Sequence, residues 1–115
     1  MIAVIFEVTP KAEGKAQYFD IALGLKEHLQ QIDGFISVER FQSLVESEKF
    51  LSLSFWRDED AIKTWRNHME HQSAQHKGRS ELFADYRLRV ASVVRDYGLN
   101  EREQAPEGSK SHEVE

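Results

Sequence analysis

The sequence predicts an α+β protein with a ferredoxin-like βαββαβ order, in which one antiparallel sheet carries both helices on one face. Three observations support this prediction. Apolar residues alternate with a period of two in four segments, and they recur at helical spacing in two others. The segments follow one another as strand, helix, strand, strand, helix, strand. The chain has 115 residues, which is enough for one domain with a real core.

Residues 2–8 are predicted to form the first strand. Apolar side chains occur on both faces of this strand, which indicates burial on both sides. Pro10 ends the strand, because proline cannot continue a ladder of backbone hydrogen bonds. The first helix is predicted over residues 14–32, where apolar residues fall at helical spacing. The Asp33-Gly34 pair that follows is typical of a helix end.

Residues 35–44 and 50–56 are predicted to be the next two strands. The short polar link at residues 46–49 favours a hairpin between them. Asp58 is suited to cap the N-terminus of the second helix. The inward stripe of that helix is predicted to consist of Ala61, Ile62, Trp65, Met69 and Gln72.

A long fourth strand is predicted over residues 85–97, and Gly98 ends it. The predicted domain is therefore residues 1–98, followed by a flexible polar tail at residues 99–115 that lacks core-forming residues. Two helices cover only one face of a sheet, so the other apolar face needs a cover. We expect a second copy of the chain to supply it, giving a homodimer that closes into an α+β barrel.

The composition excludes several classes of function. The chain has no cysteine, which rules out disulfides, thiolate catalysis and cysteine-ligated metals. The net charge is −5, of which the segment after Asn100 carries −3, so the body is almost balanced and no nucleic acid or membrane partner is expected. No signal peptide and no apolar run of ~18 residues is present, so a cytoplasmic location is expected.

The chain resembles the antibiotic biosynthesis monooxygenase family of dimeric α+β barrels over roughly residues 1–98. The likeness is carried by Asp33-Gly-Phe-Ile-Ser-Val-Glu-Arg40, Leu51-Ser-Leu-Ser-Phe-Trp56-Arg-Asp-Glu-Asp, Trp65-Arg-Asn-His68, Ala74-Gln75-His76 and Tyr86-Arg-Leu-Arg-Val90. The resemblance implies a pocket between the helices and the sheet, lined by the second helix. In one branch of the family, oxygen attacks an electron-rich phenol or hydroquinone without metal or flavin.

A second branch of the family degrades haem. There a histidine on the second helix binds the iron, assisted by an earlier tryptophan and by an asparagine on the first strand. Trp65 matches the tryptophan, but His76 is displaced from the place of the histidine, and Glu7 stands where the asparagine is expected. The resemblance therefore favours a protein without a cofactor over a haem protein.

The candidate catalytic residues are His76 and Glu7. His76 follows Trp65 by eleven positions, so both lie on nearly the same helix face, where an imidazole can act as a base. Glu7 shares a strand face with Ala3 and Ile5, and a buried carboxylate also suits a general base. The alternative for Glu7 is a solvent-facing residue or one paired with arginine. If the Glu7 face turns toward the helices, Glu7 and His76 are predicted to line one cavity.

The predicted substrate contacts are Trp65, Met69, His68, Gln72 and Phe6. Trp65 suits an aromatic wall for a planar ligand, and it equally suits a core position between helix and sheet. His68 and His71 have a spacing that can bring two imidazoles to one metal, but no third ligand is evident, so no metal site is expected.

The function predicted from these residues is a cofactor-independent monooxygenase that acts on a small aromatic or quinol-like molecule. In this hypothesis Glu7 or His76 removes a phenolic proton, and the resulting anion passes an electron to oxygen. One alternative is a haem-binding or haem-degrading monooxygenase. Another is a non-catalytic small-molecule-binding or stress-associated dimer.

Overall fold

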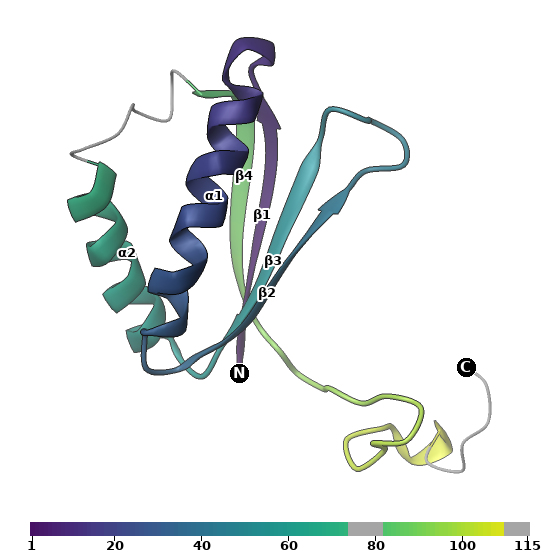
Figure 1. Cartoon of the computed structure of the whole chain (residues 1–115). Helices are drawn as coiled ribbons and strands as arrows, with labels where there is room; N and C mark the ends of the chain where they lie inside the picture. Colours follow the sequence, from purple (N-terminus) through teal and green to yellow (C-terminus); the bar gives the residue numbers. More distant parts are fainter. Residues whose placement is uncertain (74–81, 110–115) are drawn as a thin grey trace.

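A computed structural model describes the protein at residues 1–73 and 82–109, with the backbone alone at residues 70–73 and 109. The chain forms a four-stranded sheet and two α-helices (Figure 1). In chain order the elements are β1 Ile2–Pro10, η1 Ala12–Gly14, α1 Lys15–Gln30, β2 Phe35–Gln42, β3 Phe50–Trp56, α2 Glu59–Ser73, β4 Phe83–Ser92 and η2 Glu107–Ser109. The predicted ferredoxin-like α+β fold is confirmed.

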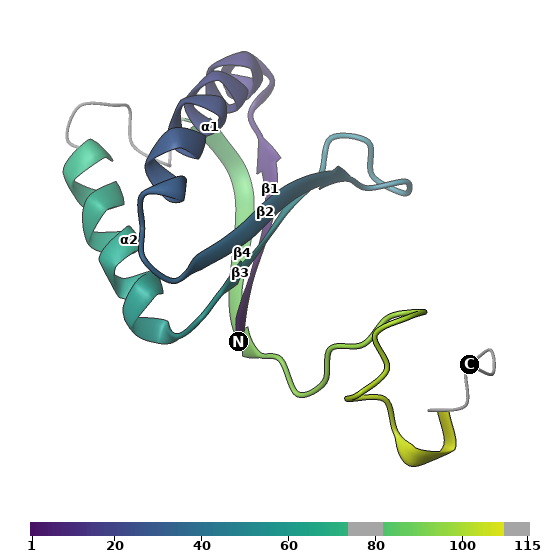
Figure 2. The ribbon, with the colours of Figure 1, turned by 60° about the horizontal axis from the view of Figure 1, so that its bottom comes forward.

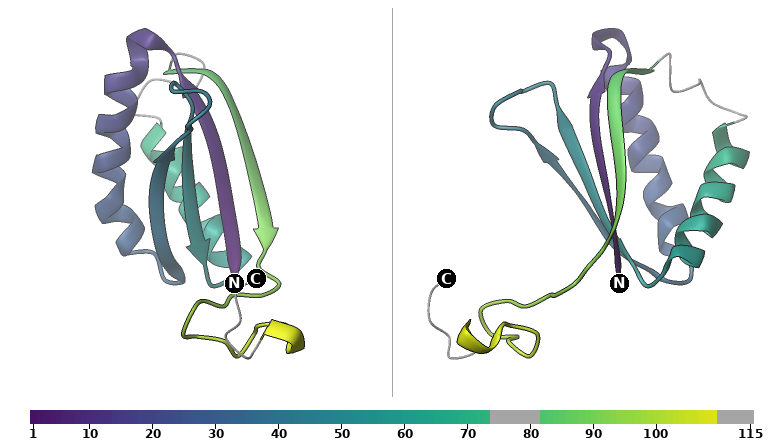
Figure 3. Two further views of the ribbon diagram at one scale, coloured as in Figure 1. Left: turned by 90° about the vertical axis from the view of Figure 1, so that its right-hand side faces the viewer. Right: turned by 180° about the vertical axis from the view of Figure 1, so that it is seen from behind.

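The strand order in the sheet is β2-β3-β1-β4, and each neighbouring pair is antiparallel. β1 is central and pairs with β3 through Ile2 opposite Trp56 and Val8 opposite Phe50. Both helices lie on one side of the sheet, and no element of the described chain covers the other side (Figures 1 and 3). We call these sides the helix-covered face and the open face.

Alternation along β1 assigns its side chains to the two faces. Ile2 and Val4 pack against the core cluster, so the even-numbered residues, Phe6 among them, point to the helix-covered face. Ile5 and Glu7 point to the open face and are only partly buried. The predicted burial of this strand on both sides is therefore incomplete within a single chain.

Trp56 is the centre of the core at one end of the sheet. Its side chain is 2% exposed and clusters with Leu29 of α1 and Ala61 of α2. The indole Nε1 donates a hydrogen bond of 2.9 Å to Ser54 Oγ, so its polar group is satisfied in the buried position. Since this β3 side chain clusters with residues of both helices, it joins the two layers of the fold.

An aromatic cluster holds α1 against the other end of the sheet. The Tyr18 ring lies 5.4 Å from the ring of Phe83, and the Phe19 ring lies 5.0 Å from that of Phe50. Both pairs are close to edge-to-face, which is a favoured geometry for aromatic rings. α1 is therefore fixed to both β3 and β4.

Two strands end earlier than the sequence predicted. The second was expected to reach residue 44, but it ends at Gln42 because Ser43 Oγ accepts hydrogen bonds from the backbone amides of Val45 and Glu46 and begins the turn. The fourth was expected to reach residue 97, but it ends at Ser92, which pairs with Ile2 at the start of β1. One further backbone hydrogen bond, from Val93 N to Met1 O at 3.0 Å, follows beyond this point.

Residues 93–109, which we call the arm, run away from the sheet (Figures 1 and 2). The arm has internal turns, in which Gly98 N donates to Glu101 O at 2.8 Å and Asp96 N donates to Gln104 Oε1 at 2.7 Å. Ala105 is buried. The flexibility of residues 99–115 stays a prediction, but residues 99–109 have defined turns.

The turn at Gly34 provides a test of this packing. Its φ of 93° is left-handed, and a Cβ there would lie 2.7 Å from the Cβ of Ala61. We expect Gly34→Ala to lower the free energy of unfolding by more than ~1 kcal/mol, because strain and a clash add together. Gly24→Ala in α1, where a Cβ meets no atom within 4 Å, is the control and should stabilise by roughly 0.5–1 kcal/mol. Urea unfolding measures both changes, and equal effects would contradict the packing described.

Candidate functional site

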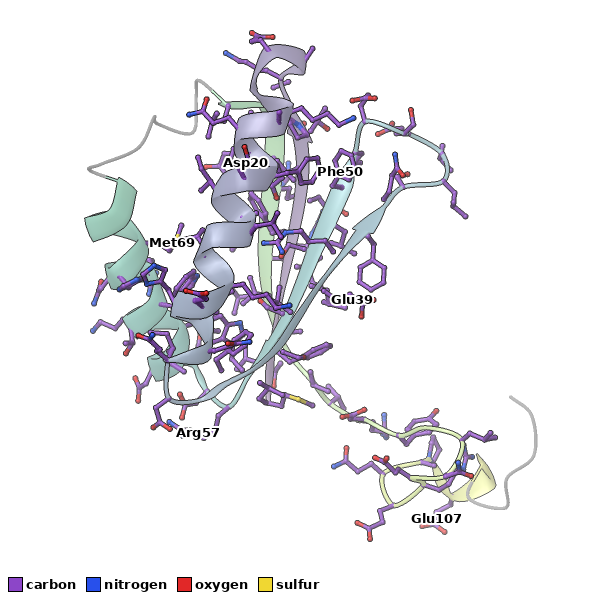
Figure 4. All side chains as sticks on the ribbon, viewed as in Figure 1. Asp20, Glu39, Phe50, Arg57, Met69 and Glu107 are labelled. Carbon is purple, nitrogen blue, oxygen red and sulfur yellow. The ribbon has the colours of Figure 1, made fainter. Side chains whose placement is uncertain are left out.

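The start of α2 is fixed by the capping residue that the sequence predicted. Asp58 Oδ1 accepts a hydrogen bond of 2.9 Å from the backbone amide of Ala61. Arg57 binds Asp58 at 3.0 Å and Asp33 at 3.2 Å, which connects the start of α2 to the turn after α1 (Figure 4). This arrangement sets the direction of α2 and hence the positions of Trp65 and His68.

Four aromatic rings lie in sequence across the helix-covered side, and we call them the ring stack: Trp56, Trp65, His68 and His28. Trp65 and His68 are stacked with ring centroids 5.5 Å apart and planes 24° apart. The His68 ring lies 5.0 Å from that of His28 on α1, and the Trp65 ring lies 6.5 Å from that of Trp56 on β3. The ring stack thus connects β3, α2 and α1.

The imidazole of His68 places a buried polar atom on the helix-covered side. Its Nε2 is buried and has no hydrogen-bond partner among the described residues. A buried nitrogen without a partner is costly, and such atoms in proteins call for an explanation such as a ligand or a catalytic role. An imidazole exchanges protons near neutral pH, so this nitrogen is suited to hold or accept a proton from a bound molecule.

β4 presents apolar side chains on the helix-covered face that the helices leave about half exposed: Tyr86, Leu88 and Val90. Leu88 lies opposite Phe6, and the rings of Phe6 and Tyr86 are 5.8 Å apart. An apolar and aromatic surface therefore remains accessible on the same side of the sheet as the ring stack.

Arg40 places a cation on the helix-covered face. It pairs with Ser52 in the sheet, and its Nε is buried without a hydrogen-bond partner among the described residues. Burial raises the pKa of the Tyr18 hydroxyl, and the neighbouring Arg40 partly offsets this effect. The guanidinium is suited to an anionic group on a ligand.

Glu7 lies on the open face, so the condition for a cavity shared with His76 is not met at Glu7, and His76 itself lies outside the described residues. Glu7 Oε2 is 3.3 Å from Arg89 Nη1 and 3.8 Å from Lys49 Nζ. The period of two correctly placed Glu7 on the same strand face as Ala3 and Ile5. Both faces of β1 are apolar, however, and the packing of Trp56 against Ile2 decides which face meets the helices. The alternative of pairing with arginine is the one observed.

The open face contains a hollow of about 260 Å³. It lies beside the β2–β3 hairpin and is lined by Glu7, Phe41, Gln42, Ser43, Lys49, Phe50 and Leu51. Its volume is near the lower limit for small-molecule pockets, and it is broadly open to solvent.

The remaining predicted residues differ in what the structure says of them. Met69 lies on α2 and is partly buried (Figure 4). Phe6 is on the helix-covered face. Gln72 belongs to α2, but its side chain lies outside the described residues, as does the whole of His76. Among the described residues no group of three or more His, Asp or Glu is placed to hold a metal ion.

Sequence reasoning missed His28 and Arg40. His28 lies three positions after Leu25 and four before Ile32, which is the helical spacing of the inward stripe, so that spacing was the available signal. For Arg40 the signal was hidden, because an irregularity between Phe35 and Ser37 changes the alternation in β2.

These features define a ferredoxin-like α+β domain with an aromatic site between sheet and helices. The model of the antibiotic biosynthesis monooxygenase family matches residues 1–77, and the chain belongs to this family. Neither helix in the described part of the chain is long and apolar enough to cross a membrane.

Two curated relatives are similar in sequence. A protein of Pyricularia oryzae called jasmonate monooxygenase ABM is 45% identical over 101 residues, which cover 88% of this chain and 47% of that protein. The chain therefore spans about half the length of this relative. The uncharacterized protein YqjZ of Bacillus subtilis is 38% identical over 94 residues, covering 81% of this chain and 79% of that protein.

Solved structures agree in fold at low sequence identity. Rv0793 of Mycobacterium tuberculosis has a TM-score of 0.72 at 17% identity, over 84% of this chain and 98% of that one. The heme-degrader MhuD of the same organism has a TM-score of 0.67 at 16% identity, over 85% of this chain and 100% of that one. At such identities the likeness establishes the fold alone.

The cap of α2 predicts a pH effect. The hydrogen bond from the Ala61 amide, followed by the Arg57 contact, lowers the pKa of Asp58. The ionised carboxylate therefore stabilises the fold above the unfolded pKa of ~3.9, and this contribution is lost as pH falls through the lower folded value. We expect Asp58→Ala to lower the melting temperature at pH 7, with a difference from wild type that shrinks below pH ~4. Glu59→Ala in the first turn of α2 is the control, and a difference independent of pH would contradict the assignment.

Proposed function

We propose that the protein is a monooxygenase that acts, without a cofactor, on a small aromatic or quinol-like molecule bound on the helix-covered face. The observation that carries this proposal is the unpartnered Nε2 of His68 within the ring stack. Membership of the family supports the class of reaction.

The side chains of this face suit a flat apolar substrate. Trp65 and Phe6 offer aromatic rings, and Met69 is adaptable in shape. The half-exposed strip on β4 adds apolar surface. Arg40 adds positive charge to the same side, which favours the ionised form of a phenol or an acid.

The chemistry starts with proton transfer from a quinol hydroxyl to His68 Nε2. The quinolate is electron-rich and reduces oxygen; one oxygen atom forms a bond to a ring carbon and the other leaves as water. The net change converts a quinol and O2 to a hydroxyquinone and water. The substrate supplies both electrons, so no further reductant is required.

The name of the Pyricularia oryzae relative adds a second substrate to test. Jasmonate is a carboxylate, and Arg40, a half-buried cation with an unpartnered Nε among the described residues, suits such a group. A panel of quinols and jasmonate, assayed for oxygen uptake with and without an electron donor, separates the two possibilities.

We also propose that the protein works as a homodimer joined through the open face, whose apolar side chains need a cover.

His68 provides the direct test of this function. We expect His68→Ala to lower turnover of a responsive quinol by ~10²-fold or more with a small change in melting temperature, because the proton acceptor is lost. Trp65→Phe keeps most of the packing and should weaken substrate binding. Steady-state oxygen uptake measures both effects. A loss of turnover in Glu7→Gln with full activity in His68→Ala would move the chemistry to the open face and overturn the proposal.

Haem binding is the second candidate, because an unpartnered imidazole nitrogen is also suited to ligate haem iron. If this candidate is correct, haemin added to the protein gives a shifted Soret band, and His68→Ala abolishes the shift. If haemin gives no Soret shift and no substrate in the panel is turned over, the non-catalytic binding dimer becomes the better account.

A further inference from the structure

Three apolar residues of β4 stay open to water although they point to the helix-covered face. Tyr86 is 46%, Leu88 is 52% and Val90 is 46% exposed, and we call these three side chains the β4 strip. On the neighbouring strand, Val8 lies opposite Tyr86 and is only 1% exposed. The cover of this face is therefore incomplete at the edge strand β4, where an apolar band one strand wide remains accessible (Figure 3).

The sequence of β4 separates apolar from charged side chains. Asp85, Arg87 and Arg89 alternate with the residues of the strip, so they point to the open face, where Arg89 pairs with Glu7. Edge strands in contact with water usually carry charges that protect them from other chains. The β4 strip has none, and an accessible apolar band of this kind marks a binding surface.

The β4 strip is continuous with the ring stack. Val90 pairs with Val4 of β1, and Val4 packs against the core cluster that contains Trp56. Trp65 packs against the same cluster. The strip therefore begins beside the tryptophans of the ring stack and runs along β4 to Tyr86, away from them. A ligand whose ring lies at Trp65 can extend onto it.

The dimensions of the strip suit a single hydrocarbon chain. Tyr86 and Val90 are four residues apart on β4, which corresponds to about 13 Å along a strand, and the width is one strand spacing of about 5 Å. An extended chain of roughly ten carbons has this length, because each C–C bond of ~1.5 Å advances the chain by a little less than its own length. Leu88 and Val90 have no side-chain atom that forms hydrogen bonds, so a ligand needs to be apolar here.

We propose that the substrate is a quinol with an unbranched alkyl or alkenyl side chain of up to about ten carbons, whose ring lies at Trp65 and His68 and whose chain lies on the β4 strip. This inference rests on the proposed function and narrows its substrate class. The chain binds away from the reacting ring. It therefore limits the orientations in which the ring can present its hydroxyl group to His68 Nε2.

A binding series tests the chain site without any turnover. The probes are resorcinol and its 4-alkyl derivatives, whose meta hydroxyl groups cannot form a quinone, titrated by calorimetry below the concentrations at which they form micelles. We expect the affinity to rise about twofold to threefold per added methylene, less than the ~4-fold of full burial because the strip is open on one side. The rise should level off near ~10 carbons, where the strip ends.

Leu88→Thr removes apolar surface from the centre of the strip and keeps a residue that suits a strand. We expect the affinity for 4-octylresorcinol to fall at least ~10-fold, whereas the affinity for resorcinol itself stays the same. An unchanged affinity for resorcinol also shows that the variant is folded. Leu23→Gln, at an exposed leucine on α1, is the control and should leave the whole series unchanged.

Oxygen uptake with the matching alkylhydroquinones tests the same chain in the reaction. We expect kcat/KM to rise with chain length as the affinity does, because the chain contributes binding free energy to the transition state. The rise should be flatter in Leu88→Thr and unchanged in Leu23→Gln.

The outcomes separate this inference from the proposed chemistry. A series that levels off near the expected length and flattens in Leu88→Thr supports the chain site. A rise that is the same in wild type and Leu88→Thr, or hydroquinone turnover that does not improve with chain length, overturns the chain site and leaves the chemistry. The β4 strip would then be a surface for another protein. Binding that follows chain length without turnover of any alkylhydroquinone overturns the chemistry and leaves the chain site, and no binding of any probe overturns both.

Discussion

The position of Trp56 is the constraint on which the rest of the structure depends. This β3 side chain is buried in a cluster with residues of both helices, and its one polar atom is bound to Ser54. Because exposing the Trp56 side chain to water would lower the free energy of unfolding, its burial fixes which face of the sheet meets the helices. It also sets the start of the ring stack, because Trp65 packs against Trp56 and His68 stacks on Trp65. Core and candidate site are therefore parts of one aromatic arrangement.

Because of this constraint, the two faces of the sheet offer different chemical environments. On the helix-covered face, Phe6 of β1 packs against aromatic side chains. The next residue, Glu7, forms an ion pair on the open face. An apolar ligand with one acidic proton suits the first environment. The second environment, with its exposed apolar side chains and a shallow charged hollow, suits contact with another protein surface. The proposed chemistry and the proposed dimer thus use separate faces.

The sequence predicted the order and type of the main elements, because each has a clear period and clear ends. Asp58 is a signal with a direct physical meaning, and it caps α2 as predicted. Gly34 has the left-handed conformation that glycine favours, but it lies in the turn before β2, because α1 already ends at Gln30. The face of β1 was not predictable, since Ile2, Val4 and Phe6 on one side are as apolar as Ala3 and Ile5 on the other. The ring stack could not be predicted from the sequence either, because the approach of His28 to His68 depends on how two helices pack. For the first of these reasons the sequence left open whether the face of Glu7 turns toward the helices, and in the structure it is the open face.

The central claim, that ligand binds on the helix-covered face, is tested most directly by nuclear magnetic resonance. The chain has two tryptophans, so its spectrum contains two indole N–H signals. A redox-inert quinol analogue is titrated into labelled protein without oxygen. The account predicts shifts in the indole of Trp65 and in the imidazole of His68, with little change at Glu7 and Leu51. Shifts confined to Glu7, Leu51 and their neighbours in the hollow would contradict it.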